Sequence, residues 1–502
     1  MTDRWSKELD ADDIAKKAAS SSFLSIGSRI IGFVLQTGTT IALARFLVPA
    51  DFGVMAMVAP FFAIFMVLGN LGTGASVIRD KTISRGQLSF LFYLHIAVGL
   101  GLFALLNIAA PFAADFYREP KVEPVFRIMS LVALVSASGT IHTALLRRTM
   151  MYKQLTVIEI ASSIVTSASA IAMALVGFGF LTLALREVVR SICGFAGCLI
   201  ATRWLPGRPA RAKEMGDRVS FSGYVAGFSI INSLGRQGDN IILGWRWGTE
   251  VVGQYALAYR LFFMPVQILV APLQPIFINA LARLIDQPER MASWYLRYLR
   301  FGNVVALPPT IVLAVCAHPL TMVVLGEKWM TAANVIQWLA PVAGLHVTYT
   351  SIGWLNVARG AGRRHFAYAV IVVPVYLIGF WVGAYWGAEG VAIAYAATNL
   401  VLFLPGFLYA TWGTPIRFVS VISNLIPGFV VAIICGTLSF VVDYQCQVEG
   451  FSDILTLGLV AITATVCWLA SVWLISRDVF VFAQHEIMTR VVKNVRRADD
   501  LG

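Results

Sequence analysis

Long apolar stretches alternate with short polar segments along the whole chain. Each stretch approaches or exceeds the roughly 20 residues with which a helix crosses the hydrocarbon core of a bilayer. The pattern predicts fourteen membrane-spanning helices, at residues 22–47, 54–78, 88–114, 125–146, 155–177, 179–202, 219–243, 254–281, 301–325, 332–354, 366–386, 389–411, 418–442 and 453–475. We therefore expect an all-α integral membrane protein.

Two narrow separations decide whether this count is right. The fifth and sixth spans are divided only by Gly177–Gly179, and the eleventh and twelfth only by Gly387–Glu389. Merging either pair would invert the orientation of every later span. Cytoplasmic loops carry an excess of Lys and Arg, so the distribution of these residues tests the count.

With the N-terminus inside, 28 of the 39 Lys and Arg residues fall in predicted cytoplasmic segments, five fall on the outer side and six lie within spans. This asymmetry favours an even number of spans with both termini in the cytoplasm. It also explains the net charge of +12, because basic segments face the anionic inner leaflet. We expect no nucleic-acid partner.

Composition narrows the class of protein further. The chain of 502 residues is 58% hydrophobic and 13% charged, with a mean hydropathy of +0.75. Soluble proteins are about 45–50% apolar and about 25% charged, so a soluble enzyme and a disordered chain are both excluded. The six cysteines form no C-x-x-C pair, and the chain contains no Gly-Lys pair of a P-loop. We expect no metal site and no cofactor.

The chain resembles itself at an offset of 200 residues. Ile41, Leu43, Gly53, Ala56 and Phe62 recur as Ile241, Leu243, Gly253, Ala256 and Phe262. In both copies a short turn with an acidic residue shortly before the glycine joins two spans. Since six spans separate the copies, the repeat is parallel, about an axis along the membrane normal.

The repeat predicts the domain organisation. A cytoplasmic segment (1–21) precedes a six-helix lobe (22–202), a basic cytoplasmic linker (203–218) and a second six-helix lobe (219–411). Two additional helices (418–475) and a basic cytoplasmic tail (476–502) follow. Transporters with this plan work by rocking one half against the other.

Ionisable residues within spans are candidates for a binding site, because burying a charge in the membrane is costly unless it faces water or a partner. The arginines are suited to phosphate, which a guanidinium binds through two hydrogen bonds. We predict a cationic substrate cavity formed by Arg29, Arg186, Arg190, Arg236 and Arg260. Arg127 lies close enough to the outer interface to reach water.

Three acidic residues also lie inside spans, away from the terminal residues: Glu159, Glu187 and Asp239. They are candidates for binding a coupling ion. Alternatively, Arg236 with Asp239 and Glu187 with Arg190 form ion pairs that hold helices together.

Three segments resemble those of a known family. Residues 43–53 (LARFLVPADFG) closely resemble the first-turn signature of the polysaccharide transporter family, residues 253–260 (GQYALAYR) its second-half counterpart, and residues 326–329 (GEKW) a further recurring loop. Similarity of pattern extends from about residue 15 to 475. The chain looks most like Wzx-type oligosaccharide flippases of the multidrug/oligosaccharidyl-lipid/polysaccharide exporter superfamily.

The resemblance implies two six-helix lobes in a V shape around a positively charged cavity. It implies a transporter rather than an enzyme, which moves undecaprenyl-pyrophosphate-linked oligosaccharide from the inner to the outer leaflet of the bacterial cytoplasmic (inner) membrane. The product would be exopolysaccharide, capsule or O-antigen-like polysaccharide. The glycan, a partner polysaccharide polymerase with its chain-length machinery, and coupling to a proton or sodium gradient are left open.

Three other functions are open to test. A drug or organic-cation antiporter of the same superfamily would need a carboxylate-lined cavity, whereas the interiors of the spans hold six arginines and three carboxylates. A membrane glycosyltransferase or polymerase would need room for catalytic carboxylates, and the outer loops are short. A scaffold that transports nothing would tolerate changes in the cavity.

Overall fold

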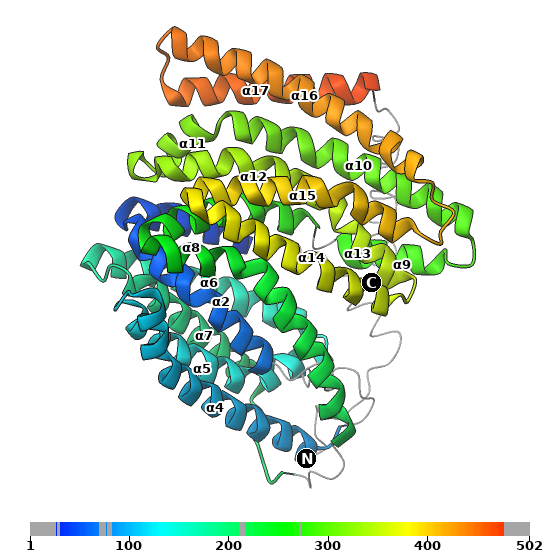
Figure 1. The fold of residues 1–502 in the computed structure, drawn as a ribbon. Coiled ribbons are helices and arrows are strands. Elements are labelled where there is room, and N and C mark those ends of the chain that lie inside the picture. The colour runs from blue at the N-terminus through cyan, green and yellow to red at the C-terminus, as the bar shows by residue number, and fades with distance from the viewer. Residues whose placement is uncertain are drawn as a thin grey trace. The chain divides into compact units, whose positions relative to one another are not determined.

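The computed structural model describes residues 27, 31–69, 77, 83–209, 216–270 and 273–475. These residues form helices joined by short turns, and no strand occurs among them, which confirms the predicted all-α class (Figure 1). The chain forms two compact units that divide between Gly253 and Gln254. The two lobes at 22–202 and 219–411 are inferred from the sequence repeat, so their boundaries stay a prediction.

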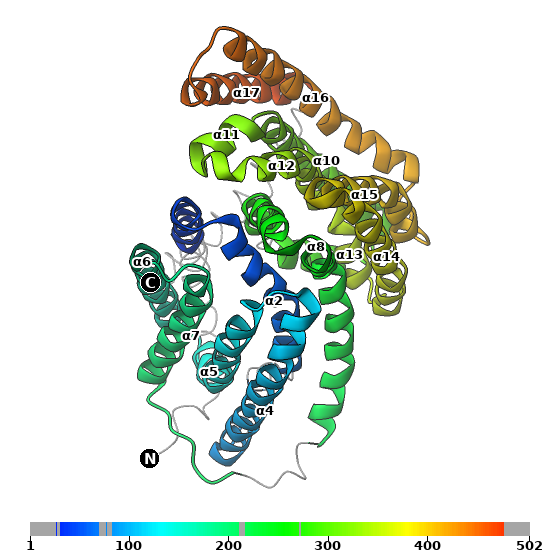
Figure 2. The same ribbon diagram turned by 60° about the vertical axis from the view of Figure 1, so that its left-hand side comes forward.

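The first unit contains helical residues 31–46 and the helices that follow them. These are α2 (Pro49–Gly69), α4 (Arg85–Tyr117), α5 (Val122–Arg148), α6 (Tyr152–Val176), α7 (Leu181–Thr202) and the first part of α8 (Gly216–Val270). Helix α5 packs between α4 and α7, as Figure 2 shows. Most of the charged residues predicted to lie within spans belong to this unit.

The second unit begins within α8 and contains the remaining helices. These are α9 (Leu273–Arg283), α10 (Pro288–Val315), α11 (Ala317–Val324), η2 (Glu327–Trp329), α12 (Met330–Tyr349), α13 (Ser351–Ala358), α14 (Gly362–Gly383), η3 (Ala384–Trp386), α15 (Gly387–Thr411), α16 (Phe418–Val448) and α17 (Asp453–Ile475). Helix α16 packs along α10 and against α17.

Both narrow separations between predicted spans are present as turns. Gly177 and Gly179 adopt positive φ angles of 89° and 55° between α6 and α7, and Gly387 adopts 73° between η3 and α15. Residues that carry a Cβ atom rarely adopt a positive φ, so glycine is the residue that lets the chain leave the helix there. Each of the fourteen predicted spans overlaps helix in the described residues, and eight stretches of that part are long and apolar enough to cross a membrane.

Several helix ends differ from the predicted span ends. Helix α10 begins at Pro288, well before the apolar stretch at 301–325. Helix α8 is broken at Gly248, whose φ of 78° and ψ of −168° are not helical, so its two parts correspond to the predicted spans 219–243 and 254–281. The span at 301–325 is itself divided at Cys316, between α10 and α11. Hydropathy locates the hydrocarbon core, whereas a helix ends where its hydrogen bonds end, so the two boundaries need not coincide.

The first signature segment is a helix start. Pro49 is the first residue of α2, where its missing N–H leaves no helical hydrogen bond unmade. Asp51 lies in the first turn of α2, and its Oδ2 accepts the backbone N–H of Val48 at 3.2 Å. The carboxylate thus accepts a hydrogen bond that this N–H would otherwise lack, and its negative charge lies at the positive end of the helix dipole.

The two copies of the repeated turn touch through their glycines. A Cβ atom added to Gly53 would lie 1.7 Å from the carbonyl oxygen of Thr249, and one added to Gly253 would lie 1.9 Å from that of Pro49. The contact is reciprocal at the offset of 200, as in an interface with two-fold symmetry. This contact supports the internal duplication. It also explains why both copies have glycine at this position, because the two backbones approach too closely to admit a side chain.

The second and third signature segments are linked by Gln254. Its side-chain Nε2 donates to the carbonyl of Lys328 at 2.7 Å, and its Oε1 accepts the N–H of Ala332 at 3.1 Å. Gly326 supplies a positive φ of 96°, and the Trp329 side chain is fully buried. One buried amide therefore satisfies both sides of the turn that leads into α12.

One of the two additional helices supplies a hydrogen-bond donor where a proline of α10 has none. In α10 the carbonyl of Val304 would accept the N–H of residue 308, but Pro308 has none. The indole Nε1 of Trp468, on α17, donates to this carbonyl at 3.0 Å. Nearby, Asn303 donates to the carbonyl of Leu425 at 2.7 Å and holds α16 on α10.

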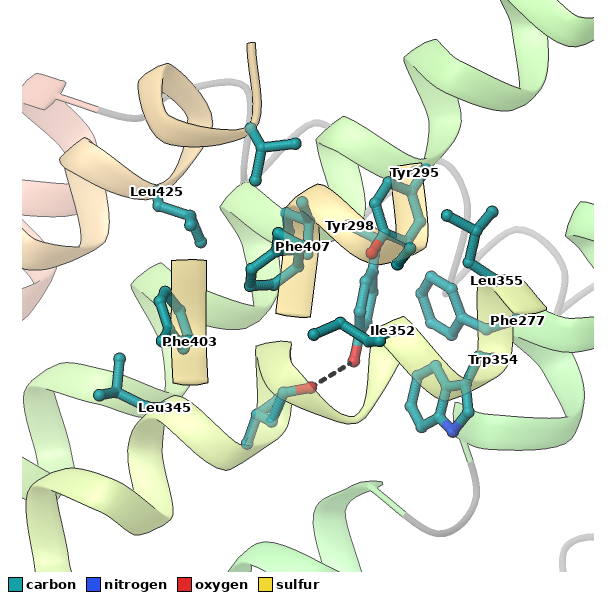
Figure 3. Close-up of a cluster of buried hydrophobic side chains, with 14 of the residues drawn as sticks. Phe277, Tyr295, Tyr298, Leu345, Ile352, Trp354, Leu355, Phe403, Phe407 and Leu425 are labelled. Carbon is teal, nitrogen blue, oxygen red and sulfur yellow. Dashed lines mark hydrogen bonds between the residues drawn. The ribbon is translucent and has the colours of Figure 1, made fainter. Parts of the chain in front are cut away.

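The core of the second unit is rich in aromatic side chains (Figure 3). The rings of Phe277 and Tyr298 have centroids 3.8 Å apart, and Trp354 packs against both. The Tyr298 hydroxyl donates to the carbonyl of Val347 at 3.1 Å. These contacts fix α9 and α10 against α12 and α13.

Substitution of either turn glycine tests the reciprocal contact. Gly53→Ala and Gly253→Ala should each lower the free energy of unfolding by about 2 kcal/mol or more, because the backbones must separate to admit a methyl group. Gly101→Ala, with nothing within 4 Å of its added Cβ, should be neutral or stabilise α4 by about 0.5–1 kcal/mol. Thermal unfolding of the purified protein measures all three, and equal behaviour of Gly53→Ala and Gly101→Ala would contradict the contact.

A double-mutant cycle tests the role of Trp468. Trp468→Phe should cost about 1–2 kcal/mol, since it leaves the Val304 carbonyl unpaired in an apolar environment. In a Pro308→Ala background the same change should cost about 1 kcal/mol less, because Ala supplies the missing N–H. Identical losses in both backgrounds, measured by thermal or denaturant unfolding, would show that the indole acts only through packing.

Candidate functional site

Three charged side chains form a cluster on α7 in the first unit. The Arg186 Nε donates to Glu187 Oε1 at 3.2 Å, and an Arg190 Nη1 lies 3.9 Å from Glu187 Oε2. The Arg186 side chain is 6% exposed, whereas that of Arg190 is 55% exposed. The ion pair of Glu187 with Arg190, considered from the sequence, is therefore present, and a second arginine shares the carboxylate.

Arg186 is incompletely paired. Its Nη1 is buried, and no atom of the described residues accepts a hydrogen bond from it. A buried charged group with an unused donor is costly, and such groups are expected where a ligand or water can bind. The cluster carries two guanidinium groups and one carboxylate, so its geometry suits an anion that reaches the Arg186 side chain.

The other predicted site residues lie apart from this cluster or outside the described part of the chain. Asp239 is buried on α8 in the first unit, and its Oδ1 accepts the backbone N–H of Asn240 at 2.8 Å. Glu159 is exposed on α6, and Arg260 is half-buried on the part of α8 that belongs to the second unit. Arg29 and the side chain of Arg236 lie outside the described residues.

The structure therefore brings Arg186, Glu187 and Arg190 together. A cavity that includes Arg29, Arg236 and Arg260 stays a prediction, as does the ion pair of Arg236 with Asp239. Arg127 is exposed and pairs with Glu123 one helical turn away, in keeping with its place near the interface.

A cluster of tyrosines in the second unit was not predicted. Tyr349 and Tyr368 hydroxyls are 2.6 Å apart, and the Tyr376 hydroxyl donates to Asn399 at 2.9 Å. Tyr395 packs against both Tyr376 and Tyr259. The five rings, Tyr259, Tyr349, Tyr368, Tyr376 and Tyr395, are all partly exposed and come from α8, α12, α14 and α15.

The sequence holds only a faint signal for this tyrosine cluster. Tyr368 and Tyr376 are eight residues apart, which places them on one helical face. The other three come from separate helices, and only the fold brings them near. Partly exposed aromatic rings with hydroxyl groups are suited to contact a polar ligand that also has apolar faces.

Two basic residues, one at the end of α13 and one in the first turn of α14, have structural partners. Arg359 donates to the carbonyl of Gly413 at 3.0 Å, and Arg364 donates to that of Trp412 at 3.0 Å and stacks on the Tyr409 ring. Burial, and then the nearby Arg364, lower the pKa of Arg359. These arginines satisfy carbonyls at the end of α15, where no helical donor remains.

Comparison with known proteins identifies relatives in polysaccharide assembly. A family model described as "Polysaccharide biosynthesis protein" matches residues 42–334, which is more than half of the chain. The chain is 23% identical over 414 residues to the teichuronic acid biosynthesis protein TuaB of Bacillus subtilis (strain 168), an alignment that covers 80% of this chain and 83% of TuaB. It is 24% identical over 396 residues to the lipopolysaccharide biosynthesis protein WzxC of Escherichia coli (strain K12), covering 77% and 78%.

The fold is shared with a solved membrane transporter. The structure of the lipid II flippase MurJ in an inward closed conformation matches with a TM-score of 0.71 over 92% of this chain and 99% of that chain, at 12% sequence identity. At this identity the match shows a common fold. It agrees with the membrane-spanning helices described above.

Proposed function

Because the chain belongs to the polysaccharide biosynthesis protein family, we propose that it is a flippase for lipid-linked oligosaccharides. It moves undecaprenyl-pyrophosphate-linked repeat units from the inner to the outer leaflet of the bacterial cytoplasmic membrane. The family and the fold are those of multi-pass membrane transporters, so the expectation of a transporter rather than an enzyme is confirmed. TuaB is named for teichuronic acid biosynthesis, WzxC for lipopolysaccharide biosynthesis and MurJ as a lipid II flippase.

One observation carries the anionic part of the proposal. Arg186 is 5% exposed, lies in an apolar helix and keeps a buried nitrogen without a hydrogen-bond partner among the described residues. A pyrophosphate offers several charged acceptor oxygens, which suit the bidentate geometry of guanidinium. Arg190 adds a second, more exposed guanidinium on the same helix. Arg29, Arg236 and Arg260 extend this cationic path in the proposal.

The tyrosine cluster supports the glycan part of the proposal. A sugar presents hydroxyl groups at its edge and C–H groups on its faces. Tyrosine offers a hydroxyl and an aromatic face in one side chain, and its ring loses little conformational freedom on binding. The five partly exposed tyrosines of the second unit thus form a surface on which different sugars can bind.

Transport in this proposal follows alternating access. Both termini lie in the cytoplasm, as the excess of basic residues in the inner segments indicates. Asp239, Glu187 and Glu159 are the candidates for a proton or sodium site. Glu187 is favoured among them for coupling to substrate, because it shares its carboxylate between Arg186 and Arg190.

Arg186→Met separates a functional role from a structural one. The change removes a buried charge with an unused donor and keeps much of the side-chain volume. It also takes one partner from Glu187, which is partly exposed and keeps Arg190, so thermal stability should change by no more than about 1 kcal/mol. Export of the surface polysaccharide should fall by tenfold or more. Arg127→Gln, which changes an exposed arginine paired within its own helix, is the matched control and should keep export. A less stable Arg186→Met protein with normal export would contradict the assignment.

Deletion of the gene tests the function itself. Complete lipid-linked repeat units should accumulate on the cytoplasmic face of the inner membrane while polymer is lost, and both are measured in lipid extracts and by leaflet-specific labelling. Incomplete units would place the protein in assembly of the repeat unit. Unchanged intermediates with altered resistance to cationic toxins would favour the drug antiporter.

A further inference from the structure

A basic pocket lies between α9 and α10 in the second unit. Its volume is about 580 Å³. The lining residues are Ala280, Arg283, Leu284, Arg290, Ser293, Trp294 and Arg297. It combines three guanidinium groups and a hydroxyl with an apolar wall, and it uses none of the residues assigned above to the transport path.

No carboxylate of the described residues forms an ion pair with the arginines of this pocket. Within the described ranges, no carboxylate lies within 4.0 Å of Arg283, Arg290 or Arg297. The hydrogen-bond partners of the last two are neutral, because Arg290 donates to Gln287 at 2.7 Å and Arg297 to Ser293 at 3.3 Å. The pocket therefore offers an anion three positive charges.

The helix geometry increases this preference for an anion. Arg290 lies in the first turn of α10, where the positive end of the helix dipole makes a cation unfavourable. Arg297 is seven residues further on, and therefore on the same face of the helix. A bound anion would relieve the repulsion between these groups and the dipole.

The apolar wall of the pocket is rigid. Trp294 packs on Phe277 with ring centroids 4.7 Å apart, and Phe277 belongs to the aromatic core of the unit (Figure 3). The pocket lies just before the predicted span that starts at Phe301, so the predicted topology puts it at the edge of the hydrocarbon core. Tryptophan at this depth is typical of a membrane interface.

We infer that this pocket binds the diphosphate of a polyprenyl-linked sugar at the inner-leaflet surface, before the lipid enters the transport path. The inference rests on the proposed flippase function and on the proposed orientation, which puts residues 282–300 on the cytoplasmic side. The guanidinium groups bind the diphosphate, and the Trp294 and Leu284 side chains contact the first part of the prenyl chain.

Charge matching favours a diphosphate over an ordinary phospholipid. A phosphodiester headgroup carries a single negative charge, whereas a diphosphate that links a prenyl chain to a sugar carries two on adjacent groups. Three converging arginines and Ser293 can satisfy more acceptor oxygens than one phosphate presents. The pocket therefore holds a store of substrate at the membrane surface and raises its local concentration.

Lipid binding by the purified full-length protein tests the inference. The probes are undecaprenyl diphosphate and phosphatidylglycerol, each titrated in detergent and measured by native mass spectrometry, with inorganic pyrophosphate as competitor. Arg290→Gln combined with Arg297→Gln should weaken undecaprenyl diphosphate binding at the pocket by about tenfold or more, so that one bound lipid per protein is lost while the site at Arg186 keeps its own. Pyrophosphate should compete with the lipid in the unaltered protein. Arg283→Gln, on the facing helix α9, should also weaken undecaprenyl diphosphate binding.

Arg417→Gln is the matched control, because Arg417 is an exposed arginine on the same predicted side, just before α16. It should bind the lipid as the unaltered protein does. Equal losses of both lipids in the double variant would assign the pocket to ordinary anionic phospholipid and overturn the inference. Undiminished undecaprenyl diphosphate binding by the double variant, with an unchanged melting temperature, would also overturn it.

The two proposals fail in different ways. If deletion of the gene leaves lipid-linked repeat units unchanged, the flippase function fails whatever the binding experiment shows. If deletion traps these units and the double variant binds and exports normally at limiting expression, the function stands and the pocket inference fails. The inference predicts slower export by the double variant at limiting expression, restored when the lipid-linked unit is in excess.

Discussion

In a bilayer, each backbone N–H and carbonyl must find a partner within the protein, because an unpaired group in hydrocarbon costs several kcal/mol. Helices satisfy this constraint along the spans, and side chains satisfy it where helices break. Trp468 donates to a carbonyl that a proline leaves unpaired within a predicted span. In the turns outside the predicted spans, Gln254 binds both sides of one turn and Arg359 donates to a carbonyl just beyond the end of α15. These residues hold the scaffold.

Arg186 differs from these residues, because it is buried and its Nη1 has no hydrogen-bond partner among the described residues. The arginines of this chain fall into two groups. Some, such as Arg359 and Arg364, donate to carbonyls and have a structural reason to be present. Others, such as Arg186 and Arg297, keep charge that the described carboxylates do not fully neutralise. The second group is where anion binding is expected.

The fold could be predicted from the sequence because its signals are local. Apolar length marks each span, and glycine marks the turns at 177–179 and 387. Helix ends and side-chain burial depend on tertiary packing. The spacing of Arg186 and Arg190 predicts one face, but only the structure shows that one is buried and the other exposed. The tyrosine cluster and the α9–α10 pocket combine residues from separate helices, so no single stretch of sequence reveals them.

The hydrogen bond from Trp468 to Val304 also sets an order of events during synthesis. The two residues are 164 positions apart, so at 5–20 residues per second the indole is made roughly 10–30 s after the carbonyl. During that interval α10 enters the membrane with a polar group that its own helix cannot satisfy. The second unit therefore reaches its final packing only when α17 has been made, and a chain that stops before Trp468 leaves the Val304 carbonyl of α10 without this donor.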